Sequence, residues 1–123
     1  MSSKTSKLAQ AAITVEAGSQ TYTLTPNLRA VRAIEAKFGG LISALHILGT
    51  GNLSATAFVI AAGAGLDTNK RKELEAVEEA VFEGGVNHVG SQTVKLIEAL
   101  LNPGGKTREQ IEAEQEEAGN ASE

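Results

Sequence analysis

The alternation of apolar and polar residues near the start of the chain predicts a β-hairpin. Apolar and polar residues alternate over residues 13–17 and again over 21–24, with Gly18-Ser19 between the two stretches. A period of two is typical of strands that bury one face, and Gly-Ser favours a turn. Two strands alone are marginally stable, so the apolar side of the hairpin over 13–24 should pack on helices or pair with another subunit. That side consists of Ile13, Val15, Tyr22 and Leu24.

The rest of the body, residues 26–102, has helical periodicity. Thr25-Pro26 suits a helix start, because Thr can cap free N–H groups and proline fits the first helical position. This first helix is expected to end at Gly39-Gly40. Its inward face should contain Leu28, Ala30, Val31, Ile34 and Phe38.

Two further helices follow in the uncharged middle of the chain. A short one over 41–48 should cluster its apolar side chains, with Ile47 alone on the opposite side. The clustered residues are Leu41, Ile42, Leu45 and Leu48. Ser54 can cap the next helix, from 55 to about 66, which is apolar nearly all round. Such a helix should be central to the fold or covered by a partner.

The last two helices complete the body. Asp67-Thr68-Asn69 offers caps for a fourth helix that ends at Gly84-Gly85. Its expected inward residues are Leu74, Val77, Val81 and Phe82. A fifth helix over 86–101 should break near Gly90-Ser91. The predicted fold class is therefore mainly α: an N-terminal β-hairpin followed by about five short packed helices and a flexible acidic C-terminal tail.

The two ends of the chain differ from the body. The 123 residues fit one domain, for which we expect residues 13–102, preceded by a flexible N-terminus over 1–12. Residues 103–123 form a Gly-rich linker and an acidic tail. Ile111 is the only large apolar residue of that tail, so the tail should order only against something else.

The distribution of charge excludes several classes of partner. Residues 1–102 are neutral, and two cations against six carboxylates from residue 103 onward account for the net charge of −4. Nucleic-acid binding needs a basic face, which this balance does not provide. The uncharged stretch between Lys37 and Asp67 is interrupted by polar residues and falls short of the ~20 apolar residues that a membrane span needs. We expect neither a nucleic-acid nor a membrane partner.

The candidate nucleotide and histidine motifs are incomplete. Gly105-Lys106-Thr107 matches the end of a P-loop, but Leu100 occupies the position of the first glycine. His46 and His88 are the only histidines, and the chain has no cysteine, so neither has a partner at ligand spacing. No catalytic residue is visible.

A possible calcium loop also fails. Asp67, Asn69 and Glu78 occupy its first, third and twelfth positions, but Arg71 and Lys72 stand where a ligand and a glycine are needed. We interpret Asp67 and Asn69 as helix caps. The chain is therefore not expected to be an enzyme, and no cofactor, metal or small-molecule substrate is expected.

Three segments carry a resemblance to a known family: "TYTLTPNLRAVRAIEAKFGG", "GNLSATAFVIAAGAGL" and "LEAVEEAVFEGGVNHVGSQTVKLIEALL". The order of a Y-x-L strand, a helix ending in IE-x-x-FG, an Ala/Gly-rich helix and a later V-F-E-x-G resembles the small tail assembly chaperones of long-tailed phages and gene transfer agents. The resemblance covers about residues 13–102. Its motif residues are Tyr22, Leu24, Ile34-Glu35, Phe38-Gly39, Ala61 to Gly65, Val81-Phe82-Glu83 and Gly85.

This resemblance implies a non-enzymatic role. Such chaperones coat the long helical tape measure protein, keep it soluble and help recruit tail tube subunits. They act in the host bacterial cytoplasm and are absent from the mature virion. The alternative interpretation is a structural virion protein, such as a tail tube or head-tail connector component, although a tube subunit usually needs more β-structure.

Residues 38–66 are the candidate surface for such a role, because uncharged helices can cover an apolar helical client. We expect five residues to contribute to client contact or self-assembly, with ordinary core packing as the alternative for each. They are Leu41, Ile42, Ile47, Phe58 and Ile60. Exposed apolar helices also favour a homo-oligomer.

Overall fold

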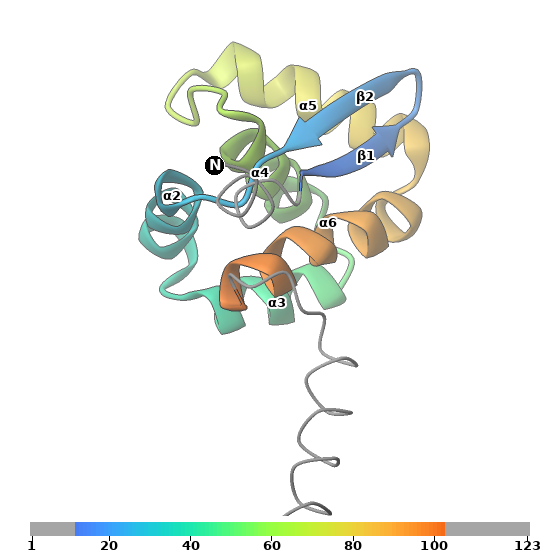
Figure 1. Ribbon diagram of the computed structural model, residues 1–123. Helices are drawn as coiled ribbons and strands as arrows, with labels where there is room; N and C mark the ends of the chain where they lie inside the picture. The colour runs from blue at the N-terminus through green and yellow to red at the C-terminus, as the bar shows by residue number, and fades with distance from the viewer. Residues whose placement is uncertain (1–11, 103–123) are drawn as a thin grey trace, which may run out of the picture.

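The computed structural model describes residues 12–102 and has the predicted order of elements (Figure 1). An antiparallel pair of strands precedes five helices, which make up 68% of the described residues. The strands are β1 (Ile13–Ala17) and β2 (Gln20–Leu24), and the helices are α2 (Leu28–Phe38), α3 (Leu41–Gly49), α4 (Leu53–Ala64), α5 (Arg71–Gly84) and α6 (Val86–Leu101). The mainly α fold class with an N-terminal hairpin is confirmed. The expected N-terminal segment up to residue 11 and the acidic tail from 103 lie outside the described residues.

The hairpin packs its apolar side inward, as predicted. Pairing of Ala17 with Gln20 leaves Gly18-Ser19 as a two-residue turn, in which Gly18 has φ +62°. Such turns match the twist of the strands but need a positive φ, which glycine adopts readily. The backbone N–H of Ser19 donates to Glu83 Oε1 at 3.0 Å, so the turn is tied to the end of α5.

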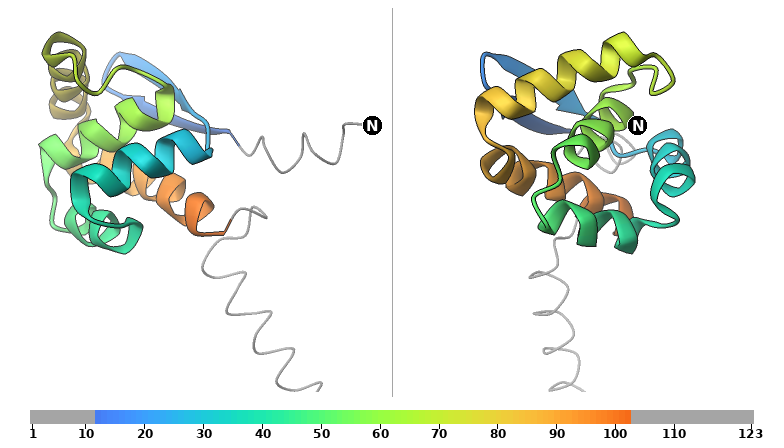
Figure 2. Two further views of the ribbon diagram at one scale, coloured as in Figure 1. Left: turned by 90° about the vertical axis from the view of Figure 1, so that its left-hand side faces the viewer. Right: turned by 180° about the vertical axis from the view of Figure 1, so that it is seen from behind.

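Helix α4 is the centre of the fold (Figures 1 and 2). It packs against α2, α3, α5, α6 and β2, which explains why it is apolar nearly all round. Gly63 allows the closest approach, because a Cβ atom at this position would lie 2.7 Å from Leu96 Cδ2 and 3.0 Å from Leu24 Cβ. The backbone N–H of Thr25 donates to the Gly63 carbonyl at 2.9 Å and joins the end of the hairpin to α4.

Asparagine side chains cap two helices at positions that differ from the prediction. Asn27 Oδ1 accepts from the Ala30 N–H at 2.9 Å, and Asn52 Oδ1 accepts from the Ala55 N–H at 2.8 Å. Helix α2 therefore begins after Asn27 and not at Thr25-Pro26, and the predicted Ser54 cap of α4 is wrong. In each case the side-chain oxygen satisfies an N–H that has no partner inside the helix.

The segment before α5 also differs from the expected caps. Asp67 Oδ1 accepts from the Asn69 N–H at 2.9 Å, which makes a local turn, and the Asp67 N–H donates to Glu73 Oε1 at 3.0 Å. The helix begins only at Arg71, after Lys70, and no side chain caps it. Asp67 and Asn69 therefore shape the approach to the helix, and their interpretation as caps is wrong.

Helix α6 runs without the predicted break. Gly90 is buried inside it, and the Thr93 hydroxyl donates to the Val89 carbonyl of the same helix at 2.8 Å. A glycine costs a helix about 1 kcal/mol, which burial of one helical face readily offsets. Tertiary packing explains the continuity of this helix.

Candidate partner-binding surface

A depression of about 400 Å³ lies where four helices meet, and we call it the Phe58 groove. Its apolar wall consists of Phe38, Ile47, Ala55, Phe58 and Leu74, and its polar rim of Lys37, Asn52, Ser54, Arg71 and Glu78. The four large apolar side chains are half-buried. Phe38 and Ile47 also pack against the core. The groove therefore offers apolar surface bounded by a polar rim.

Two aromatic rings shape the wall of the groove. The rings of Phe38 and Phe58 meet edge to face, with centroids 5.7 Å apart and an interplanar angle of 89°. Lys37 Nζ lies 5.5 Å from the centroid of the Phe58 ring. Edge-to-face packing and a cation over a ring each favour one ring orientation, so Phe58 is held in place without being covered.

The structure brings two of the five predicted contact residues together. Ile47 and Phe58 both line the Phe58 groove. Ile60 is fully buried in the core, so it offers no surface to a partner in this fold.

The other two predicted contact residues lie at the start of α3. Leu41 is half-buried against the core, whereas Ile42 is 64% exposed. Ile42 and Ile47 are five positions apart, so they project about 140° apart around the helix axis. Ile42 does not line the groove and forms a separate exposed apolar position.

Two other large apolar residues were expected to point inward and do not. Leu28 is 61% exposed on α2, and Phe82 is 78% exposed on α5. The expected clustering of Ile42 with its apolar neighbours is also wrong, because Ile42 is exposed. The buried face of each helix combines an alanine with larger apolar residues, and Leu28, Ile42 and Phe82 lie outside it. The buried residues are Ala30 and Ile34 on α2, Ala44 and Leu48 on α3, and Val77, Ala80 and Val81 on α5.

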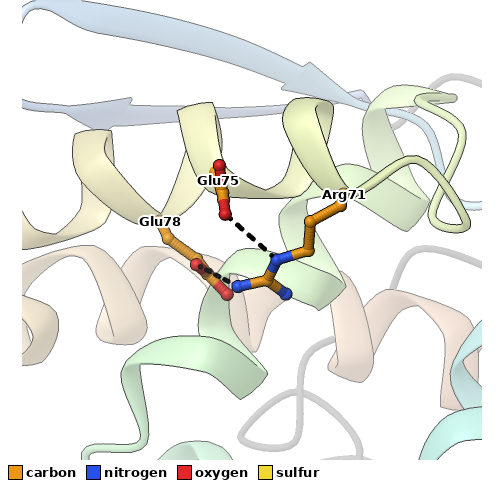
Figure 3. Close-up of polar contacts among 3 residues, drawn as sticks. All are labelled: Arg71, Glu75 and Glu78. Atoms are coloured by element: carbon orange, nitrogen blue, oxygen red, sulfur yellow. Dashed lines mark hydrogen bonds and ion pairs between the residues drawn. The ribbon is translucent and has the colours of Figure 1, made fainter.

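One side of α5 carries three charged side chains in contact (Figure 3). Arg71 Nε lies 3.3 Å from Glu75 Oε2, and Arg71 Nη2 lies 3.4 Å from Glu78 Oε1. The Arg71–Glu75 pair is exposed, and exposed pairs contribute roughly 0–1 kcal/mol, because water and salt screen them. These contacts order the side chains on one side of the helix without forming an acid/base site.

Candidate chemistry is not assembled elsewhere in the described residues. Between residues 12 and 102 no three potential metal ligands come together, and both His46 and His88 are exposed. Gly105-Lys106-Thr107 lies outside the described range. None of the helices in that range has the length and apolar character needed to cross a bilayer. The Phe58 groove is the surface that combines two of the predicted contact residues.

Comparison of the chain with protein-family models, with curated proteins and with solved structures finds no match.

Proposed function

We propose that the chain is a tail assembly chaperone that binds a tape measure protein, keeps it soluble and helps recruit tail tube subunits. The proposal rests on the resemblance of residues 13–102 to that family and on one structural observation. That observation is the Phe58 groove, a depression with an apolar wall that includes Ile47 of α3 and Phe58 of α4.

The groove supports the proposal through its chemistry. Helices α3 and α4 contain no Asp, Glu, Lys or Arg. A client helix with an apolar face can place side chains between Ile47 and Phe58, and a carboxylate beside them could pair with Lys37. Lys37, Arg71 and Glu78 at the rim can contact polar residues at the edge of such a client.

The arrangement of the motif residues also supports the proposal. Gly39 ends α2 with φ +88°, and Gly65 ends α4 with φ +79°. Both glycines adopt the left-handed backbone conformation that commonly ends helices. Residues with a side chain adopt this conformation only at an energetic cost. The glycines that carry the resemblance thus end α2 and α4, and both helices contribute residues to the Phe58 groove.

The test is recovery of the client from assembling cells. The full chain is tagged in cells that carry the neighbouring tail genes, bound proteins are identified by mass spectrometry, and finished tails are analysed in parallel. We expect the tape measure protein among the bound proteins and the chain in the host cytoplasm, with none in finished tails. Stoichiometric incorporation of the chain into finished tails would contradict the proposal and favour the structural virion protein.

A further inference from the structure

A second surface lies along α5, around the exposed ring of Phe82. At 78% exposure this is the most exposed large apolar side chain of residues 12–102. It borders a broad open depression of about 1150 Å³ that also includes Tyr22, Leu53 and two alanines of α5. We call the charged and aromatic part of this depression the Phe82 face, and it consists of Arg71, Glu75, Glu78, Glu79, Phe82 and Glu83.

The Phe82 face is strongly acidic. Its four carboxylates stand against a single cation, Arg71, which gives the face a net charge of −3. Arg71 is already shared between Glu75 and Glu78. Glu79 makes no ion pair or side-chain hydrogen bond within the described residues, so its charge is available to a partner.

Helical spacing aligns these groups. Glu75, Glu79 and Phe82 are separated by four and three positions, so they form one row along α5. The row covers about 10 Å, or two helical turns. Glu83 is held by the hairpin turn, because its carboxylate accepts from the Ser19 N–H at 3.0 Å and from the Ser19 hydroxyl at 3.3 Å. The row therefore lies on a rigid helix whose end is anchored.

The charge decides which occupant fits. Nucleic acid would meet like charge, and a second copy that presented the same face would do so too. Lys or Arg side chains complement the carboxylates, and a guanidinium can also stack on the exposed ring of Phe82. An apolar side chain beside them would cover the rest of that ring.

We propose that the Phe82 face binds a basic amphipathic helix of a partner protein, with cations opposite Glu75 and Glu79 and an apolar residue on Phe82. This proposal does not rest on the chaperone function. The Phe82 face shares Arg71 and Glu78 with the rim of the Phe58 groove, so the two surfaces adjoin.

The test uses an unbiased probe. Random displayed peptides of about 16 residues, enough for roughly four helical turns, are selected on the full chain and depleted on its Phe82→Ser variant. We expect the selected peptides to be rich in Lys and Arg with apolar residues at helical spacing. Their affinity should fall at least tenfold on Phe82→Ser or Glu79→Lys, and should weaken as salt is raised to ~0.3 M.

Matched controls separate binding from folding. Leu28→Ser removes an apolar side chain of similar exposure from another helix and should leave peptide affinity unchanged. Thermal unfolding of Phe82→Ser should match that of the unaltered chain, since the ring is largely outside the core. Selected peptides that are acidic or uncharged, or whose binding ignores Phe82, would overturn the proposal. So would a change from oligomer to monomer on Phe82→Ser in sedimentation equilibrium, because that face would then be covered by a second copy.

Discussion

Gln92 of α6 forms two hydrogen bonds with the backbone of Glu16 on β1. The Glu16 N–H donates to Gln92 Oε1 at 2.8 Å, and Gln92 Nε2 donates to the Glu16 carbonyl at 3.0 Å. A side chain thus takes the place that a neighbouring strand would occupy. This contact joins residues 76 positions apart and closes part of the outer edge of β1.

Replacement of Gln92 should therefore loosen the hairpin. Gln92→Ala leaves both backbone groups of Glu16 to water, so we expect a loss of about 1 kcal/mol in the free energy of unfolding, measured by denaturant titration. Ser91→Ala is the control, because the Ser91 hydroxyl bonds only to the His88 carbonyl of its own helix. Equal stability of the two variants would show that the contact contributes nothing.

Gly63→Ala should destabilise the core. The added methyl group would meet Leu96 and Leu24 within 3.0 Å, and such overpacking costs typically ~1–3 kcal/mol, more than alanine returns as a better helix former. Gly49→Ala is the matched control, because nothing lies within 4 Å of a Cβ at that position. A Gly63→Ala chain that melts at or above the temperature of Gly49→Ala would contradict the close packing of α4.

The asparagine caps can be tested against the serine that the sequence favours. Asn52→Ala should cost about 1 kcal/mol of unfolding free energy, and Ser54→Ala only a few tenths. Thermal unfolding followed by circular dichroism compares them. A larger loss of stability in Ser54→Ala than in Asn52→Ala would show that Ser54 caps α4, as the sequence predicted.

Alkaline pH should weaken the fold through Tyr22. Burial raises the pKa of the Tyr22 phenol above its ordinary value of 10.0. The folded state therefore favours the neutral phenol, and this contribution is complete below pH 10 and is lost as the pH rises through the folded pKa. The unfolding midpoint of Tyr22→Phe should fall less steeply above pH 10 than that of the unaltered chain, and parallel profiles would exclude Tyr22 as the cause.

The groove residues should affect client binding more than other exposed apolar residues do. Ile47→Asn places an amide in the Phe58 groove, and we expect less tape measure protein to be bound in pull-down experiments. Leu28→Asn alters an apolar residue outside the groove and should bind normally. Folding of both variants is checked by circular dichroism, because Ile47 is half-buried. Loss of cooperative unfolding in Ile47→Asn would assign this residue to the core.

The sequence predicted the elements better than the surfaces. Alternation over 13–24 and the Gly39-Gly40 and Gly84-Gly85 stops depend on local backbone preferences, so the hairpin and the helices could be identified. The orientation of each helix depends on the neighbours that it meets. Helical spacing alone did not show which side of α2 and α5 meets its neighbours, so the pattern of large apolar residues placed Leu28 and Phe82 inward, although both are exposed.

The candidate surfaces could not be predicted from the sequence, because each depends on how the helices pack. Phe38, Ile47, Phe58 and Leu74 come from four helices, and no spacing along the chain brings them to one groove. One feature of the sequence indicated that Phe82 is exposed: it stands about 140° around the helix from Val77, which is buried. No feature of the sequence indicated the contact between Gln92 and Glu16.

The most direct test of the proposed function is the solubility of the tape measure protein made alone and together with this chain, in a host without other tail proteins. The soluble fraction is measured after centrifugation at equal expression. The chaperone account predicts an aggregated tape measure protein that becomes soluble in a complex with the chain. A tape measure protein that stays insoluble with the folded chain present, or that is equally soluble without it, would contradict that account.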